Sequence, residues 1–244
     1  MLREVRTRFG RHRLGYVWAL VQPALHIGTW FVIRSVLRQS GGAADMSGLL
    51  FLATGIVPFL SFSDVASFVK GSISANRPLL AFPPVRNIDA IVARFLLESA
   101  TMIIVGTATF AFLMWIGEAG WPARFDQVAL ATGGVLLLGL GFGAFNSIAA
   151  LLSPTYGKLL ASLQRILYFT SGLFFSPESM PKEVLWWLSW NPVLHGVELF
   201  RMGYSSLYIS SVASIWYLLA WALGFLLVGL SLERMTRPRL RELQ

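Results

Sequence analysis

Apolar residues fall into six long stretches along the chain, and short segments rich in charged or turn-forming residues separate them. Each stretch is close to or above the roughly 20 residues that a helix needs to cross the hydrocarbon core of a bilayer. We therefore predict an all-α membrane protein, a single transmembrane domain over residues 1–244 with six transmembrane helices. The predicted spans are residues 16–37, 49–69, 88–116, 128–152, 159–175 and 212–232.

The segment before the last span follows a different pattern. Residues 177–203 contain two apolar runs that are too short to cross a membrane, and prolines interrupt them at Pro181 and at Asn191-Pro192. Proline breaks a helix because it lacks an N–H and its ring clashes with the preceding turn. We predict a re-entrant helical hairpin that enters the outer leaflet and returns. Such backbone is tolerated at membrane depth only inside protein or beside a watery cavity, so the hairpin suggests a passage.

Basic residues are distributed unevenly between the two ends of the predicted spans. With the N-terminus placed inside, 15 of the 20 Lys and Arg residues fall on the cytoplasmic side. The positive-inside rule then places both termini in the cytoplasm. The arginine-rich residues 1–13 are expected either to lie on the membrane surface as an interfacial helix or to form a frayed basic tail.

Composition narrows the class of protein further. Hydrophobic residues make up 55% of the chain and charged residues 13%, against roughly 25% charged residues in a typical soluble domain. The net charge of +8 comes mostly from short segments between apolar runs, so nucleic acid is not an expected partner. The absence of cysteine excludes disulfides and cysteine metal sites. No internal repeat is visible, which disfavours secondary transporters built from inverted repeats.

Three polar side chains recur every three residues in the second half of the hairpin. His195, Glu198 and Arg201 would form one stripe on a helix. A metal or catalytic site would need further ligands or a nucleophile, and the other two histidines, His12 and His26, are remote in sequence. Two interpretations stay open: the stripe lines or gates an outer exit, or it is a hydrogen-bonded set that only braces the hairpin.

The cytoplasmic loop after the second span carries a short apolar patch. In residues 70–87, KGSISANRPLLAFPPVRN, a polar start leads to a Leu-Leu-Ala-Phe run and a Pro-Pro stop. This segment could present a short helix to a groove on a partner protein, or it could be an ordinary loop resting on head groups. No G-x-x-x-x-G-K-[ST] phosphate loop occurs in the chain, so any energy source must lie on another subunit.

Some residues within the spans carry more specific expectations. Gly139 and Gly143 have the small-xxx-small spacing that allows close helix packing. Arg94 and Glu98 lie four residues apart and are expected to pair. Charged side chains are costly in lipid, so they should face the bundle or reach an edge. Those within the spans are Arg34, Asp64, Glu98 and Arg165.

Three ordered motifs make the chain resemble a known family. They are R-x-R-L-G-Y-x-W-x-L-x-x-P from Arg11 to Pro23, the segment from Asn76 to Pro83, and N-P-V-L-H-G-V-E-L-F-R from Asn191 to Arg201. Together they resemble the permease subunit of ATP-binding-cassette exporters of polysaccharides, and most closely the capsular polysaccharide exporters of Gram-negative bacteria. The N-terminal region before the first motif is short by comparison.

The resemblance implies a homodimer in the bacterial inner membrane, with a canal at the dimer interface and two copies of a separate ATPase. It implies no cofactor in this chain, since ATP and Mg would be bound by the ATPase. The cargo would be a lipid-linked capsular-type polysaccharide moved from cytoplasm to periplasm, and a periplasmic or outer-membrane export complex is a further expected partner. Residues 70–83 would form the coupling helix, and residues 177–203 would frame the periplasmic exit.

The resemblance and the side-chain chemistry also suggest site residues. Sugars bury their C–H faces against aromatic rings, so aromatic residues near the span interiors and the hairpin are expected to line the canal. The expected canal and gate residues are Trp18, Phe59, Phe62, Tyr168, Phe174, Phe175, Trp187, His195, Glu198 and Arg201. For Trp18 an interfacial belt is the competing explanation. The expected contacts to the lipid phosphate at the entrance are Arg8, Arg11 and Arg13, and those to the ATPase are Asn76, Arg77, Leu79, Leu80 and Phe82.

Two other functions compete with this interpretation. A transporter of the same class could export O-antigen, a teichoic-acid-like polymer or a small lipophilic drug. An intramembrane acyl- or glycosyltransferase using His195 or Glu198 is a more remote alternative. The transferase would turn over substrate without an ATPase, whereas the transporter would not act alone.

Overall fold

The computed structural model describes residues 14–36, 46–76, 86–153 and 155–242, and within this part of the chain the regular structure is entirely helical. The long helices are α2 (Leu14–Val36), α3 (Gly48–Lys70), α6 (Asn87–Trp115), α7 (Phe125–Leu152), α8 (Tyr156–Thr170) and α11 (Ile215–Glu242). The shorter elements are α4 (Ser72–Ala75), the 3₁₀ turn η1 (Pro177–Ser179), α9 (Lys182–Leu188) and α10 (Pro192–Tyr204). The all-α prediction is confirmed for the described residues.

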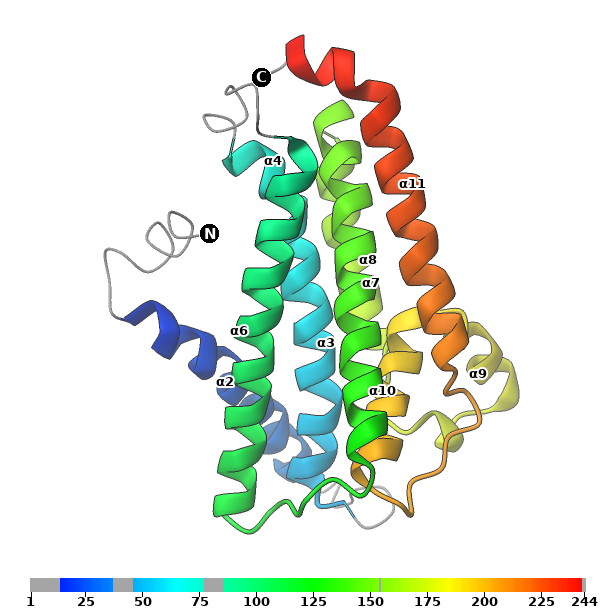
Figure 1. Ribbon diagram of the computed structural model, residues 1–244. Coiled ribbons are helices and arrows are strands. Elements are labelled where there is room, and N and C mark those ends of the chain that lie inside the picture. Colours follow the sequence, from blue (N-terminus) through cyan, green and yellow to red (C-terminus); the bar gives the residue numbers. More distant parts are fainter. Residues whose placement is uncertain (1–13, 37–45, 77–85, 154, 243–244) are drawn as a thin grey trace.

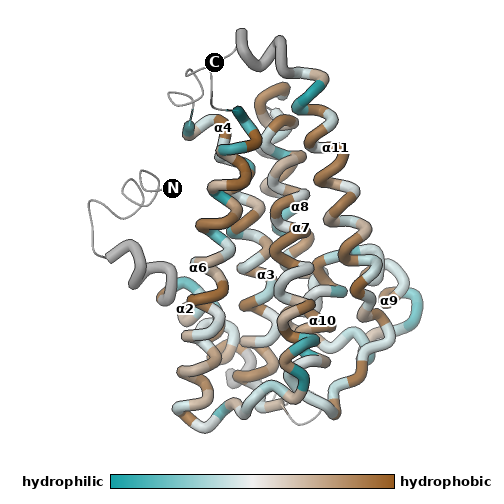
Figure 2. The backbone as a smooth tube through the Cα atoms, in the orientation of Figure 1, coloured by the Kyte–Doolittle hydropathy of each residue, from teal (hydrophilic) through white to brown (hydrophobic). Residues whose placement is uncertain are grey.

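The long helices form a bundle with two distinct ends (Figure 1). One end carries α4 and the C-terminal part of α11, and we call it the elbow end. The other end carries α10 and the turn between α6 and α7, and we call it the hairpin end. Figure 2 shows hydrophobic residues along most of the helix lengths and hydrophilic residues around α4 and the nearby part of α11.

Three helices within the described residues are long and apolar enough to cross a membrane: α3, α7 and the Ile215–Thr236 part of α11. In their most apolar stretches 83% of the α3 residues are buried, against 17% for α11. Helix α3 is therefore the central helix of the bundle, and α11 is peripheral. The other predicted spans correspond to α2, α6 and α8, and the six-span arrangement stays a prediction.

The end of the fifth predicted span needs correction. The fifth span was expected over residues 159–175, but α8 ends at Thr170 after 15 residues, which is only about 22 Å of helix. Gly172 follows the helix with φ +70°, a left-handed conformation that terminates helices and that glycine adopts without strain. The apolar residues Leu173, Phe174 and Phe175 misled the sequence interpretation, because they continue the hydrophobic run after the helix has stopped.

Close helix contacts at glycine hold α7 in the bundle. A Cβ atom on Gly139 would lie 3.0 Å from a Val65 methyl carbon, and one on Gly143 would lie 2.7 Å from the Val69 Cβ. The predicted close packing at these two glycines is confirmed, and the partner is α3. Gly141 plays the same part on the other side of α7, where an added Cβ would run into the Ala222 carbonyl of α11.

Candidate functional site

The hairpin end is organised around a break between two helices. Helix α9 ends at Leu188, and α10 begins at Pro192, where the missing N–H of proline has no helical partner to lose. The Asn191 side chain caps α10 by accepting a hydrogen bond from the Val193 N–H at 2.9 Å. The break therefore lies at Asn191-Pro192, where the sequence placed it.

Asn191 also attaches the break to the end of α8. Its Nδ2 donates hydrogen bonds of 2.9 Å to Thr170 Oγ1 and 2.9 Å to Ser171 Oγ. One buried amide thus fixes the start of α10 and the point where α8 stops. The amide uses its oxygen on its own helix and its nitrogen on the neighbour, so neither atom is left without a partner.

Arg201 is the largest fully buried side chain among the described residues. Its Nη1 donates to the Gly172 carbonyl at 2.7 Å and to Glu198 Oε1 at 2.9 Å, and its Nη2 donates to the Leu173 carbonyl at 3.2 Å. The Nη2 also reaches the Phe51 carbonyl of α3 at 3.3 Å, and the guanidinium lies 3.9 Å from the centre of the Phe51 ring. A single cation therefore joins α10, the loop after α8 and the start of α3.

Glu198 supplies the compensating charge. Its carboxylate pairs with Arg201 at 2.9 Å, and both side chains are 0% exposed. The Tyr208 hydroxyl donates to Glu198 Oε2 at 2.9 Å and lies 3.2 Å from the Ser176 hydroxyl. Removing two charges from water is expensive, and only good geometry with further hydrogen bonds offsets it. We call Glu198, Arg201 and Tyr208 the buried triad.

His195 does not join the triad. Its Nε2 lies 2.8 Å from the Ser189 carbonyl, and its ring stacks on Tyr217 of α11 with a centroid separation of 4.3 Å. The predicted stripe therefore divides into two sets of contacts, one with the Ser189 carbonyl and α11 and the other with α3 and the loop after α8. All three side chains are buried, so in this conformation their contacts are those of the bracing alternative. The gating role stays a prediction.

A group of aromatic rings joins α2, α3 and α8. The Trp30 indole N–H donates to the Tyr168 hydroxyl at 2.8 Å, and its ring lies 3.9 Å from that of Phe174. Tyr168 also contacts Phe59 at 5.2 Å and Phe174 at 5.3 Å between centroids. Phe169, which is 52% exposed, lies 5.2 Å from Tyr168. We call these five residues the aromatic group.

Three of the expected canal residues belong to the aromatic group: Phe59, Tyr168 and Phe174. Phe59 is 4% exposed and Phe62 is 1% exposed, so both support the group from the core and neither offers a surface to a cargo here. Trp30 and Phe169 were not among the expected canal residues. The sequence offered a signal for each, because Trp30 is an aromatic residue on the first predicted span and Phe169 directly follows Tyr168. The rings that are at least partly accessible are those of Trp30, Tyr168, Phe169 and Phe174.

The remaining expected canal residues lie elsewhere. Trp187 is 71% exposed on α9, next to Trp186 at 4.7 Å, outside the aromatic group. Phe175 is partly buried in the loop after α8. Trp18 is on α2, but its side chain lies outside the described part of the structure, as do Arg8, Arg11 and Arg13.

Only the beginning of the expected coupling segment is described. Helix α4 covers Ser72–Ala75, and Asn76 ends it with Nδ2 donating to the Ser72 carbonyl at 3.0 Å. The other expected ATPase contacts, Arg77, Leu79, Leu80 and Phe82, lie outside the described residues. Helix α4 lies at the elbow end. The coupling role of residues 70–83 stays a prediction.

Charges within the spans lie inside the bundle or at its surface. Asp64 of α3 accepts a hydrogen bond from Gln22 of α2 at 3.3 Å, and Glu98 of α6 is 1% exposed. Arg165 of α8 is exposed, and whether it reaches the membrane edge stays a prediction. The Arg34 side chain is outside the described part. Among the described residues, no group of His, Asp and Glu could hold a metal ion.

A cavity of about 550 Å³ next to α10 has no counterpart among the sequence predictions. It lies between α3, α6, α7 and α10, and Phe200 and Tyr204 line it from α10. No motif marks it, because it arises from how two successive helices diverge.

Comparison with known proteins identifies relatives over nearly the whole chain. A family model described as ABC-2 type transporter matches residues 1–204. The polysialic acid transport protein KpsM of Escherichia coli is 36% identical over 233 residues, which is 96% of this chain and 90% of that protein. The capsule polysaccharide export inner-membrane protein CtrC of Neisseria meningitidis is 29% identical over 231 residues, 95% of this chain and 87% of that protein. The capsule polysaccharide export inner-membrane protein BexB of Haemophilus influenzae is 29% identical over 231 residues, 94% of this chain and 86% of that protein.

Proposed function

This chain belongs to the ABC-2 type transporter family, and on that premise we propose that it is the permease subunit of an ATP-driven exporter that moves a lipid-linked capsular-type polysaccharide from the cytoplasm to the periplasm. The observation that carries the proposal is the match over 94–96% of the chain to relatives named for transport of polysialic acid or export of capsule polysaccharide. Polysaccharide cargo is favoured over a drug because all three of these names specify a polysaccharide.

The arrangement in the membrane follows from the charge distribution. The elbow end, with α4 and the C-terminal part of α11, faces the cytoplasm, and the hairpin end faces the periplasm. Six helices cross the bilayer, with both termini inside. The α9–α10 hairpin dips into the outer leaflet, where the buried triad supplies partners for the carbonyls of Gly172 and Leu173 that follow α8.

Helix α8 provides the surface for a second copy of the chain. Leu159 is 66% exposed, Ile166 59% and Phe169 52%, and Arg165 and Ser162 are also exposed on this helix. A helix that exposes both apolar and polar side chains suits a protein interface around a hydrated canal better than a purely lipid-facing position. Two copies would bring two aromatic groups together, and their accessible rings would contact the C–H faces of a sugar polymer.

The energy comes from a separate ATPase that docks at the elbow end. Residues 70–83 are the coupling segment, and Leu79, Leu80 and Phe82 enter an apolar groove on the ATPase, with Asn76 and Arg77 beside it. Arg8, Arg11 and Arg13 hold the phosphate of the lipid-linked cargo at the cytoplasmic leaflet. The transporter works with ATP and Mg on the partner subunit.

Deletion of the gene tests the function. The deletion strain should keep synthesising polymer but retain it inside the cell, and expression of the chain from a plasmid should restore polymer at the surface. Normal surface polymer in the deletion strain would refute the proposal. If the purified chain alone turned over an acyl or glycosyl donor, the transferase alternative would replace it.

The coupling role has its own test. Replacing Leu79 and Leu80 by aspartate places two carboxylates in an apolar groove at a large desolvation cost, so copurification of the ATPase and export should both fall strongly. The matched control, Leu79→Ile with Leu80→Ile, keeps the groove apolar and should retain both. Unchanged export by the aspartate variant would exclude this segment as the coupling element.

A further inference from the structure

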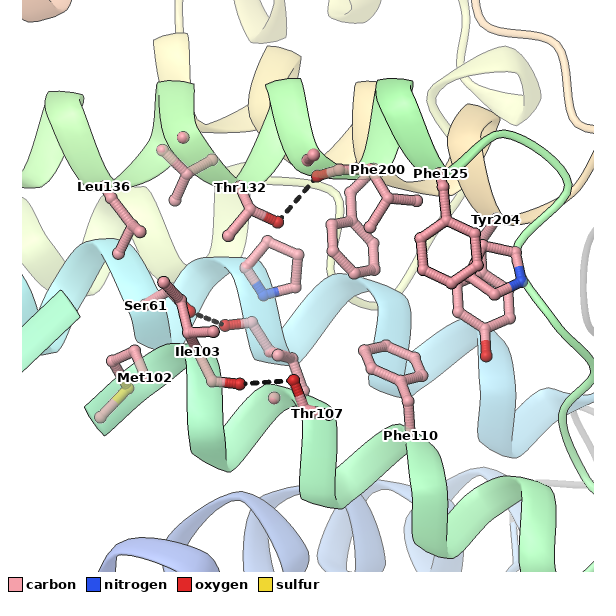
Figure 3. Close-up of a pocket in the computed structure, with 18 of the residues that line it drawn as sticks. Ser61, Met102, Ile103, Thr107, Phe110, Phe125, Thr132, Leu136, Phe200 and Tyr204 are labelled. Carbon is pink, nitrogen blue, oxygen red and sulfur yellow. Dashed lines mark hydrogen bonds between the residues drawn. The ribbon is translucent and has the colours of Figure 1, made fainter. Parts of the chain in front are cut away.

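The cavity beside α10 is walled by apolar side chains. Residues of α3, α6, α7 and α10 line its volume of about 550 Å³, and none of the lining residues is charged (Figure 3). Helices α6 and α7 follow each other in the chain but diverge, and the cavity opens between them. Phe110, Phe125, Phe200 and Tyr204 gather at one end of it.

The few hydroxyl groups in the wall already have partners. Ser61, Thr107 and Thr132 each donate to the carbonyl four residues earlier on their own helix, at 2.9, 2.8 and 2.8 Å. Tyr204 donates to the Gly120 carbonyl at 2.9 Å. A buried water typically makes about three hydrogen bonds to polar groups that would otherwise lack partners. This wall offers almost none, so the cavity suits hydrocarbon better than water or a sugar.

The mouth of the cavity is bordered by outward-facing apolar side chains. Among the lining residues themselves, Ile103 of α6 is 51% exposed, Phe125 of α7 is 60% exposed, and Trp121 of the α6–α7 turn is 77% exposed. An apolar mouth continuous with an apolar outer surface opens toward lipid in a membrane protein. The occupant would therefore come from the bilayer.

The depth of the cavity matches one leaflet. Its wall on α6 runs from Met102 to Met114, which is about 18 Å at a rise of about 1.5 Å per residue. Half of a hydrocarbon core of about 30 Å is about 15 Å. Trp121 and Phe125 close the end next to the α6–α7 turn, where aromatic residues commonly mark the membrane interface.

The turn at that end carries charges of both signs. Glu118, Arg124 and Asp126 are exposed there, and Arg124 is held in place because its Nη2 donates to the Met202 carbonyl at 2.8 Å. A phosphate beside a cation and an ammonium beside a carboxylate are complementary pairs. A zwitterionic head group fits this turn better than one with net negative charge.

We propose that the cavity between α6 and α7 binds one acyl chain of a membrane phospholipid with a zwitterionic head group, in the leaflet that borders the α6–α7 turn. In the orientation of the proposed function this is the periplasmic leaflet, away from the elbow end where the lipid-linked cargo would enter. The resident lipid fills space that side chains leave empty and so maintains the separation of α6 from α7.

Photo-crosslinking of the full chain tests the site. The chain is reconstituted in vesicles of phosphatidylethanolamine and phosphatidylglycerol that contain phosphatidylethanolamine with a diazirine near the end of one acyl chain. We expect labels on cavity-facing residues such as Met102, Val135 and Leu136. Labels confined to outward-facing Ile104 and Leu130 would overturn the proposal. The same probe on phosphatidylglycerol should label the cavity less, and stronger labelling would refute the head-group assignment.

A cavity-filling variant gives an independent readout. A Cβ added to Gly133, which lines the cavity, or to Gly224, on the exposed side of α11, meets nothing within 4 Å. In native mass spectrometry, Gly133→Phe should retain several-fold less phospholipid than wild type, and the matched control Gly224→Phe should retain as much. Equal retention in Gly133→Phe would overturn the proposal. If Gly133→Phe fails to fold, the crosslinking of the wild-type chain still decides whether the cavity binds lipid. Neither readout involves polymer, so both are independent of the exporter proposal.

Discussion

Helix α10 buries charged side chains on one face and borders an apolar cavity on another, and the two faces differ in how their side chains find partners. One face carries Glu198 and Arg201, which are fully buried and meet carbonyls, a carboxylate and a hydroxyl from the protein itself. The other face carries Phe200 and Tyr204, which border a cavity that no side chain fills. The two charged side chains find most of their partners within the chain, whereas Phe200 and Tyr204 border space that the proposed lipid would fill.

This difference follows from the physical chemistry of the two kinds of group. A buried charge without partners is costly, so its position is fixed by several directional bonds. An apolar surface is satisfied by any hydrocarbon of suitable shape, and lipid tails are as apolar as leucine. The triad face is therefore expected to be rigid and intolerant of substitution, and the cavity face to be adaptable. The following variants test that contrast.

The largest effect is expected for Arg201→Met. The substitution keeps most of the volume but leaves Glu198 buried without its cation, which typically destabilises by about 3–5 kcal/mol. The free energy of unfolding, measured by titration with denaturing detergent, should fall by that order. The double variant Glu198→Gln with Arg201→Met should recover part of the loss, because no unpaired charge remains. A single variant as stable as wild type would show that the pair contributes little.

A smaller effect is expected for Tyr208→Phe, with Tyr204→Phe as the control on the other face. The Tyr208 hydroxyl donates to the Glu198 carboxylate, and such bonds to charged groups contribute about 1.5–3 kcal/mol. The Tyr204 hydroxyl donates to a neutral carbonyl, and such a bond contributes about 0.5–1.5 kcal/mol. The same titration should rank Tyr208→Phe as the more damaging change. The reverse order would contradict the contrast between the two faces.

Next in size is Gly172→Ala, in the loop that Arg201 holds. Gly172 has φ +70°, and a Cβ there would lie 2.7 Å from a Leu194 methyl carbon. Gly117 has φ +79° with open space around it, so Gly117→Ala isolates the backbone strain, which is about 1–2 kcal/mol. Gly172→Ala should destabilise more than Gly117→Ala in thermal unfolding. Equal losses would mean that the loop adjusts freely and that the triad does not fix it.

The smallest effect is expected at Glu178, outside the spans. The Ser211 N–H and hydroxyl donate to its carboxylate at 2.6 and 2.7 Å and hold the pKa of Glu178 below its usual 4.5. Because the pKa is lowered, the hydrogen bonds between Ser211 and the Glu178 carboxylate stabilise the fold above about pH 4.5. This stabilisation is lost as the pH falls through the lower folded-state pKa. The stability difference between wild type and Glu178→Gln should be constant at neutral pH and shrink on acidification. A difference that grows in acid would contradict this sign.

The sequence predicted the parts that depend on local pattern. Apolar length placed α2, α3, α6 and α7 within three residues at each end, although α8 ends before the predicted span and α11 continues beyond it to Glu242. The spacing of Gly139 and Gly143 predicted their close helix packing, and Asn191-Pro192 predicted the break before α10. These features depend on neighbours in the chain. Tertiary partners were not readable in the same way.

Two features of the site show why its tertiary contacts could not be predicted from the sequence. The partners of Arg201 include carbonyls of Phe51 and Leu173, which are distant in sequence and carry no side-chain signal. The cavity results from the divergence of α6 and α7, which the apolar pattern of either helix does not encode. The fifth span was predicted too long because the apolar run continues through Leu173, although the chain leaves the helical conformation by Gly172.

The most direct test of the account is ATP-driven transport by inside-out membrane vesicles that contain this chain and its ATPase. Radiolabelled lipid-linked polymer is added outside, and the fraction protected from a glycan-degrading enzyme is measured. We expect protected polymer that requires ATP, the ATPase and this chain, and that is lost in the Leu79→Asp, Leu80→Asp variant. Equal protection without ATP or without this chain would contradict the central claim that it is the permease.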